Sequence, residues 1–92
     1  MAKGGEAAVK DDVKAYLTSI GAYWFMPVQT GYGRSTLDFL VCHKGCFYGI
    51  ETKRPGVIKP SSRQQLVINQ IQNADGRAFV ADSAYLVSCW LK

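Results

Sequence analysis

The chain has 92 residues, of which 48% are hydrophobic and 20% charged, and this balance predicts a single globular domain with a modest core. No apolar run approaches the roughly 20 residues of a membrane span. The amino-terminal residues have no apolar signal core, so we expect a cytoplasmic protein. Three cysteines, an odd number, fit a reduced protein better than a disulfide framework. The net charge of +4 permits an anionic partner without requiring one.

The pattern of residues 6–20 predicts an amphipathic helix, because apolar residues recur there at three- and four-residue spacing. Gly21 ends this helix. Glu6 lies in its first turn, where an acid complements the helix dipole. The same residue is close to the apolar stripe, so a functional acid that points inward is an equally good interpretation. The stripe consists of Val9, Val13, Tyr16, Leu17 and Ile20.

Residues 22–29 are rich in aromatic residues and predict a strand, with Pro27 at its end or edge. A polar loop with two glycines follows at residues 30–35 and leads into the next strand. Arg34 in this loop is either a phosphate contact beside a functional site or part of a plain connector.

The central feature of the sequence is a pair of β-rich runs on either side of Lys44 and Gly45. Such runs around a short glycine-containing break predict a β-hairpin. With these two residues as the loop, Asp38 falls directly opposite Glu51, with Cβ atoms roughly 4.5–5.5 Å apart. Lys53 lies two residues beyond Glu51, so its side chain leaves the same face of the strand.

Two carboxylates that face each other destabilise a strand pair, and a divalent cation would relieve this repulsion. Carboxylate oxygens are the hard ligands that Mg²⁺ prefers, usually in small number, with waters and phosphates completing the shell. The alternative is a pair of exposed surface acids on an ordinary hairpin. We favour the metal site because Asp38 and Glu51 both lie within apolar runs and Lys53 shares their face.

A second loop leads to a helix over residues 61–74. Ser61, with Gln64 three residues later, forms a capping box at the start of this helix. The capping box is enough to explain a glutamine at position 64. Gln64 is therefore either only a cap or also a polar group near the metal site.

The last part of the chain predicts a short apolar strand at residues 77–81 and a helix from about 84 to 91, capped by Asp82 or Ser83. The order is therefore α-β-β-β-α-β-α, an α/β fold with a mixed β-sheet flanked by helices. A helix joins the third and fourth strands, and such a crossover predicts that these two strands are parallel.

Two other chemistries have weaker support. Cys42, His43 and Cys46 surround the hairpin turn, but alternation puts the first two on opposite faces, and no fourth ligand has zinc spacing. The single histidine lies at a predicted turn tip, which disfavours a Ser-His-Asp triad.

Asp38 and Glu51-Thr-Lys53, with twelve residues between Asp38 and Glu51, resemble the signature of the PD-(D/E)XK nuclease superfamily. Further motifs surround it: Gly33-Arg-Ser-Thr-Leu-Asp38, Gly49-Ile-Glu-Thr-Lys-Arg-Pro-Gly56, Ser61-x-x-Gln64 with Val67, Ile68 and Ile71, and Gly76-Arg-Ala-Phe-Val-Ala-Asp82. Together they resemble the VRR-NUC (virus-type replication-repair nuclease) family, in its short stand-alone phage and prophage form. One departure is Leu37, where many members have proline, and another is Asp75, where many have glycine.

The resemblance implies a restriction-endonuclease-like core and a nuclease that needs Mg²⁺ or Mn²⁺. By position, Asp38, Glu51 and the backbone carbonyl of Thr52 would bind the metal. Lys53 would orient the attacking water and stabilise charge on the phosphate. The resemblance also implies that Glu6 binds the metal directly or through water, and that Gln64 is the polar residue near the site.

The resemblance further implies a DNA substrate, with branched DNA such as four-way junctions or flaps preferred, and a homodimer in a bacterial host cell. Trp90, Leu91 or the strand of Trp24 are the candidate interface residues. The alternative function is a catalytically inactive nucleic-acid-binding module with the same fold. Four cations of the two loops near the site would hold the DNA backbone: Arg34, Arg54, Lys59 and Arg63.

Overall fold

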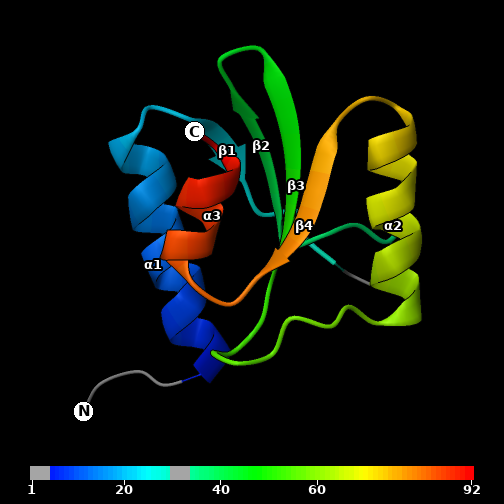
Figure 1. The fold of residues 1–92 in the computed structure, drawn as a ribbon, viewed down its shortest axis with the longest axis horizontal. Coiled ribbons are helices and arrows are strands. Elements are labelled where there is room, and N and C mark those ends of the chain that lie inside the picture. Colours follow the sequence, from blue (N-terminus) through cyan, green and yellow to red (C-terminus); the bar gives the residue numbers. More distant parts are fainter. Residues whose placement is uncertain (1–4, 30–33) are drawn as a thin grey trace.

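The computed structural model describes residues 5–29 and 34–92, and its elements follow the predicted order α-β-β-β-α-β-α (Figure 1). No helix among these residues is both long and apolar enough to cross a lipid bilayer. The elements are α1 (Gly5–Ser19), β1 (Tyr23–Phe25), β2 (Phe39–His43), β3 (Cys46–Thr52), α2 (Ser62–Asn73), β4 (Arg77–Ala81) and α3 (Ala84–Trp90).

The four strands form one mixed sheet in the order β1-β2-β3-β4. The first three strands are antiparallel neighbours, whereas β4 runs parallel to β3, as the crossover through α2 requires. The predicted strand at residues 22–29 was too long, because β1 ends at Phe25. Pro27, two residues later, has no N–H to donate to a strand ladder.

The hairpin between β2 and β3 has the predicted register. His43 pairs with Cys46 across the turn and Phe39 pairs with Ile50 at the far end. Both loop residues have positive φ, 51° for Lys44 and 80° for Gly45, as expected for a two-residue turn of type I′. The next opposed positions beyond Phe39 and Ile50 are Asp38 and Glu51, so a local turn fixes the relation of the two acids.

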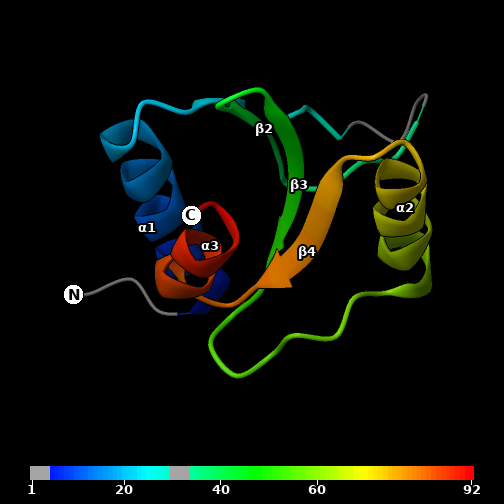
Figure 2. The same ribbon diagram turned by 45° about the horizontal axis from the view of Figure 1, so that its top comes forward.

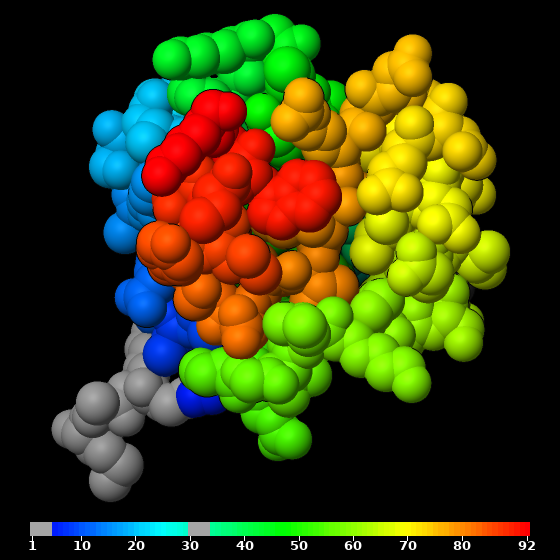
Figure 3. Space-filling model, in the orientation of Figure 1, coloured from blue at the N-terminus to red at the C-terminus, as the bar shows by residue number. Residues whose placement is uncertain are grey.

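The sheet lies between two layers of helices, with α1 and α3 on one face and α2 on the other (Figure 2). The larger core fills the space beneath α1 and α3, and a smaller cluster lies beneath α2. Figure 3 shows α3 and α2 as separate ridges on one side of the molecule, with the loop after β3 below them. The larger core includes Val13, Leu17, Phe39, Ile50 and Val87, and the smaller one Leu37, Val67, Ile68 and Ala78.

The second face of the sheet is only partly covered, because among the described residues α2 packs on β3 and β4 but not on β1 or β2. Gly49 allows this close packing. A Cβ atom at this position would lie 2.6 Å from Cδ1 of Ile71 on α2 and 3.0 Å from Cδ1 of Leu37. A larger residue would push α2 away from the strand that carries Glu51. The absence of a side chain at Gly49 therefore helps to place the start of α2 beside the predicted site.

Candidate active site

Asp38 and Glu51 lie at the end of the β2–β3 hairpin that is distant from its turn. Together with Gln64 from α2 they line a cavity of about 240 Å³. Glu51 is 6% exposed, so this carboxylate is a buried charge and not a surface acid. Arg63, Ser61, Thr36, Ser35, Gln29 and Val67 line the rest of the cavity.

Asp38 is held in one orientation by the strand opposite it. The backbone N–H and the side-chain hydroxyl of Thr52 both donate to Oδ2 of Asp38, over 3.0 and 2.6 Å. Thr52 is completely buried. Because both bonds use Oδ2, the other carboxylate oxygen, Oδ1, has no hydrogen bond to this threonine and can accept a further ligand.

Gln64 has both of the roles that the sequence left open. Its Oε1 accepts a hydrogen bond from the backbone N–H of Ser61 (2.9 Å), and the Ser61 hydroxyl accepts from the backbone N–H of Gln64 (3.2 Å). This is the predicted capping box. The amide nitrogen of the same side chain donates to Oε2 of Glu51 over 2.9 Å. The start of α2 is thus tied directly to the buried carboxylate.

The electrostatic environment of Glu51 disfavours its charged form. Burial, followed by repulsion from the Asp38 carboxylate, raises the pKa of Glu51 from 4.5 to about 7, against an opposing effect of Lys53. The Lys53 backbone is fixed at the sheet end, because its N–H donates to the Ala81 carbonyl over 3.0 Å.

Replacing Glu51 by glutamine is expected to stabilise the metal-free protein above neutral pH. Folded Glu51 holds its proton up to about pH 7, whereas the unfolded chain releases it near 4.5. Stability therefore falls as pH rises between these values. We expect the free energy of unfolding of Glu51→Gln to exceed that of the wild type by about 3 kcal/mol at pH 8, with little difference below pH 4.5. Urea denaturation in EDTA measures this, and a difference independent of pH would contradict it.

Lys10 is a residue of the site that the sequence analysis missed. Its ammonium lies 3.1 Å from Oε2 of Glu6, one helical turn earlier, and 4.0 Å from Oδ1 of Asp38. Burial lowers the pKa of Lys10, but the hydrogen bond to Glu6 and the charges of Asp38, Glu6 and Glu51 outweigh it and raise the pKa above 10.5. The four-residue spacing from Glu6 was the available signal.

Glu6 does not join the two strand acids directly. Among residues 5–29 and 34–92, no three His, Cys, Asp or Glu side chains are close enough to hold a metal ion together. Lys10 instead links the helix acid to Asp38. The role of Glu6 as a metal ligand stays a prediction, as does that of the Thr52 carbonyl.

The four predicted DNA-binding cations have different surroundings. Arg63 lines the site cavity, whereas Arg34 is outside it and donates from Nη2 to Oε1 of Gln70 over 3.3 Å. Arg54 and Lys59 are exposed on the loop between β3 and α2. Their binding roles stay predictions.

The residues at the hairpin end suit a divalent cation. Two carboxylates of adjacent strands supply hard oxygen ligands. The pKa of Glu51 is raised first by burial and then by repulsion from Asp38, and a cation would relieve that repulsion. Asp38 is already oriented by Thr52, and Glu51 by Gln64. Hydrogen bonds that orient ligands in this way are a common feature of metal sites.

Lys10→Met is expected to strengthen metal binding. The Lys10 ammonium lies beside Asp38 and would repel a cation held by that carboxylate. We expect the dissociation constant for Mn²⁺, measured by titration calorimetry, to fall by about tenfold, which corresponds to roughly 1.4 kcal/mol. The matched control is Lys14→Met, because Lys14 is one turn further along α1 and pairs with Asp11 at 3.8 Å. Weaker binding by Lys10→Met would mean instead that Lys10 holds the carboxylates in place.

No family model matches the sequence, and no curated protein matches it. A solved structure described as "VRR_NUC domain" is similar to this chain with a TM-score of 0.73 and 23% sequence identity. The similarity covers 90% of this chain and 89% of the other. It confirms the fold that the sequence resemblance implied.

Proposed function

From the fold of a VRR_NUC domain and the paired acids at one end of its sheet, we propose that this chain is a metal-dependent deoxyribonuclease of the VRR-NUC family. The observation that carries the proposal is the pair of buried Glu51 and partly buried Asp38 at the end of the hairpin, with Lys53 two residues beyond Glu51. Buried like charges are costly in a protein of this size, and a cation-dependent reaction gives a reason to keep them.

In the proposed mechanism, Asp38, Glu51 and the Thr52 carbonyl would hold Mg²⁺ or Mn²⁺, and Glu6 would bind the ion directly or through water. A bound ion of this kind lowers the pKa of a water molecule and neutralises phosphoryl oxygens. Lys53 orients the attacking water and places a fixed positive charge where negative charge develops. Gln64 fixes the position of Oε2 of Glu51 through its amide nitrogen.

DNA is the proposed substrate, and branched DNA such as flaps and four-way junctions is the proposed preference. Arg63 at the cavity and the loop cations Arg34, Arg54 and Lys59 would contact phosphates. Such contacts supply affinity without sequence specificity. The proposed setting is the cytoplasm of a bacterial host, with the chain encoded by a phage or prophage.

A homodimer is part of the proposal, and the strand of Trp24 is kept as its candidate interface. Leu91 is 5% exposed and belongs to the core, so its assignment to an interface was wrong. Trp24 packs on Phe39, and Trp90 stacks on Phe79 with ring centroids 4.4 Å apart. The side chains of Tyr23 and Phe25 are exposed on the edge strand β1. We place the proposed contact between two copies at that edge.

The experiment that tests this function incubates labelled duplex, flapped and four-way-junction DNA with Mg²⁺ or Mn²⁺, and separately with EDTA. We expect the wild type to cleave at least one of these substrates only with metal, and Asp38→Asn to cleave none. Binding without cleavage of any substrate would support the inactive nucleic-acid-binding module. Sedimentation velocity on the same sample tests the dimer, and monomer alone would remove that part of the proposal.

A further inference from the structure

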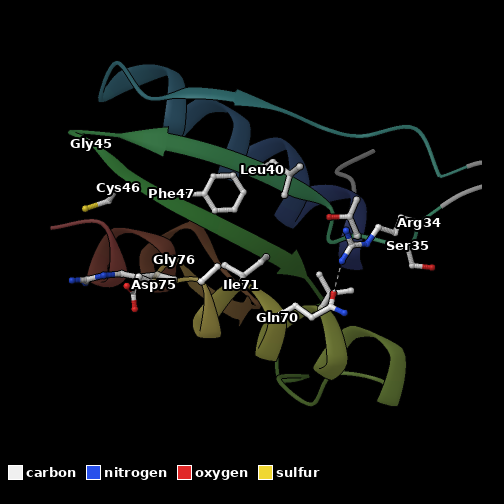
Figure 4. A pocket seen from close by; sticks show the side chains of 14 residues that line it. Arg34, Ser35, Leu40, Gly45, Cys46, Phe47, Gln70, Ile71, Asp75 and Gly76 are labelled. Carbon is white, nitrogen blue, oxygen red and sulfur yellow. Dashed lines mark hydrogen bonds between the residues drawn. The ribbon is translucent and has the colours of Figure 1, made fainter.

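A second, larger cavity lies on the same face of the sheet as the candidate active site. It is a groove of about 680 Å³ between α2 and the β2–β3 hairpin (Figure 4). Ser35, Thr36 and Val67 line both this groove and the site cavity, so the two are adjacent. The groove is therefore within reach of a long ligand that is held at the site.

The floor of this groove is apolar and contains an accessible aromatic ring. Leu40 of β2, Phe47 of β3 and Ile71 of α2 line its middle part, as Figure 4 shows. Phe47 is 44% exposed. The ring is accessible because α2 packs on β3 and β4 and leaves the hairpin side of the sheet uncovered.

Positive charges flank this apolar floor. Arg34 is at the end nearest the site, where it is bonded to Gln70. Arg77 also lines the groove, on β4 where it pairs with Tyr48, and Asp75 is the single acid in the lining. A ligand that suits this arrangement is flat and apolar in its middle and negatively charged along its length.

We propose that the groove binds unpaired bases of a DNA strand that leaves the duplex next to the phosphate held at Asp38 and Glu51. This inference rests on the proposed nuclease function and names the part of the substrate that the groove would recognise. Bases that have left the duplex expose flat faces that stack on an aromatic ring, while their phosphates bind arginines. Paired bases are stacked inside the helix and offer no such face to Phe47.

The volume is consistent with a short segment of single strand. A cavity of about 680 Å³ lies within the range of roughly 300–1,000 Å³ that is usual for small-molecule sites. A strand that enters at the site would meet Phe47 and Arg77 in the same part of the groove, because Arg77 pairs with Tyr48, the neighbour of Phe47.

The test compares Phe47→Leu, which keeps an apolar side chain but loses the ring, with Phe47→Trp, which keeps a stacking surface. Each variant is made in a Lys53→Ala background, and binding is measured in EDTA to flapped DNA and to blunt duplex. A 2-aminopurine in the flap, next to the branch, reports stacking through its fluorescence. The matched control is Tyr85→Leu, because Tyr85 is an aromatic of α3 that is 76% exposed and lies outside the groove.

We expect Phe47→Leu to bind flapped DNA roughly tenfold more weakly and to lose the quenching of 2-aminopurine. Phe47→Trp should bind flapped DNA like the parent, and duplex binding should not change in any variant. Equal losses on flap and duplex, or equal losses in Phe47→Leu and Tyr85→Leu, would overturn the proposal. A change from dimer to monomer in Phe47→Leu would also overturn it, since a second copy would then occupy the groove.

The outcomes separate this inference from the proposed function. If the wild type cleaves no DNA with either metal, the nuclease proposal fails. If the wild type cleaves DNA but Phe47→Leu in the Lys53→Ala background binds flapped DNA as tightly as its Lys53→Ala parent does, only the groove proposal fails. Thermal melts of both Phe47 variants establish that the comparison is made on folded protein.

Discussion

Lys53→Ala is expected to reduce the single-turnover rate of DNA cleavage by about a hundredfold to a thousandfold at saturating metal. This is the usual loss when one group that stabilises developing charge in a transition state is removed. Lys53 suits that role because its ammonium acts on buried Glu51 and its backbone is fixed between the ends of β3 and β4. The affinity for Mn²⁺ should not decrease, since the variant removes a positive charge from the site.

The control for this experiment is Lys14→Ala, which removes a lysine of α1 that is paired with Asp11 outside the site. It should cleave like the wild type. A Lys53→Ala protein that is folded, binds Mn²⁺ and cleaves at the wild-type rate would mean that Lys53 has no part in the chemistry. Lys10, whose ammonium lies 4.0 Å from Oδ1 of Asp38, would then be the next residue to test.

Phe39→Ala is expected to lower the free energy of unfolding by about 3–5 kcal/mol, the largest stability effect that we predict. Phe39 is completely buried in the core beneath α1, and its ring contacts Trp24 with centroids 5.7 Å apart. Domains of this size have total stabilities of roughly 5–15 kcal/mol, so such a loss is a large fraction of the total. Urea denaturation of the metal-free protein measures it.

The same change should affect the site, because Phe39 directly follows Asp38 and pairs with Ile50 beside Glu51. Loss of its ring weakens the packing that holds the two acids in register. We therefore expect cleavage to fall even at temperatures where the variant remains folded. Tyr85→Ala, at a residue 76% exposed, should change stability by no more than about 0.5 kcal/mol. Similar stability of the two variants would contradict the placement of Phe39 in the core.

The parts of the fold that the sequence predicted well depend on short-range chemistry. A two-residue turn at Lys44 and Gly45 determines the register of the whole hairpin, and that register places Asp38 opposite Glu51. The capping box at Ser61 and Gln64 likewise fixes the start of α2 from residues three apart. In both cases the residues that determine the geometry are neighbours in the chain.

The features that the sequence did not predict depend on how distant elements approach each other. Lys10 reaches Asp38 only because α1 crosses the end of the sheet, and periodicity does not describe that crossing. The groove exists because α2 covers one half of a sheet face, an arrangement that requires the close packing at Gly49. Leu91 was assigned to the surface because a terminal apolar residue has the same pattern whether it covers its own core or another chain.

The Gln64 side chain accepts a hydrogen bond from one neighbour, the Ser61 N–H, and donates one to another, the Glu51 carboxylate. A capping box accepts either glutamate or glutamine, because both provide the oxygen that receives the Ser61 N–H. Glu51 accepts only the amide, because a third acid at this distance would repel it and leave Oε2 without a donor. Glutamate and glutamine are equivalent in the capping box of α2, so it is the Glu51 carboxylate on β3 that selects glutamine at position 64.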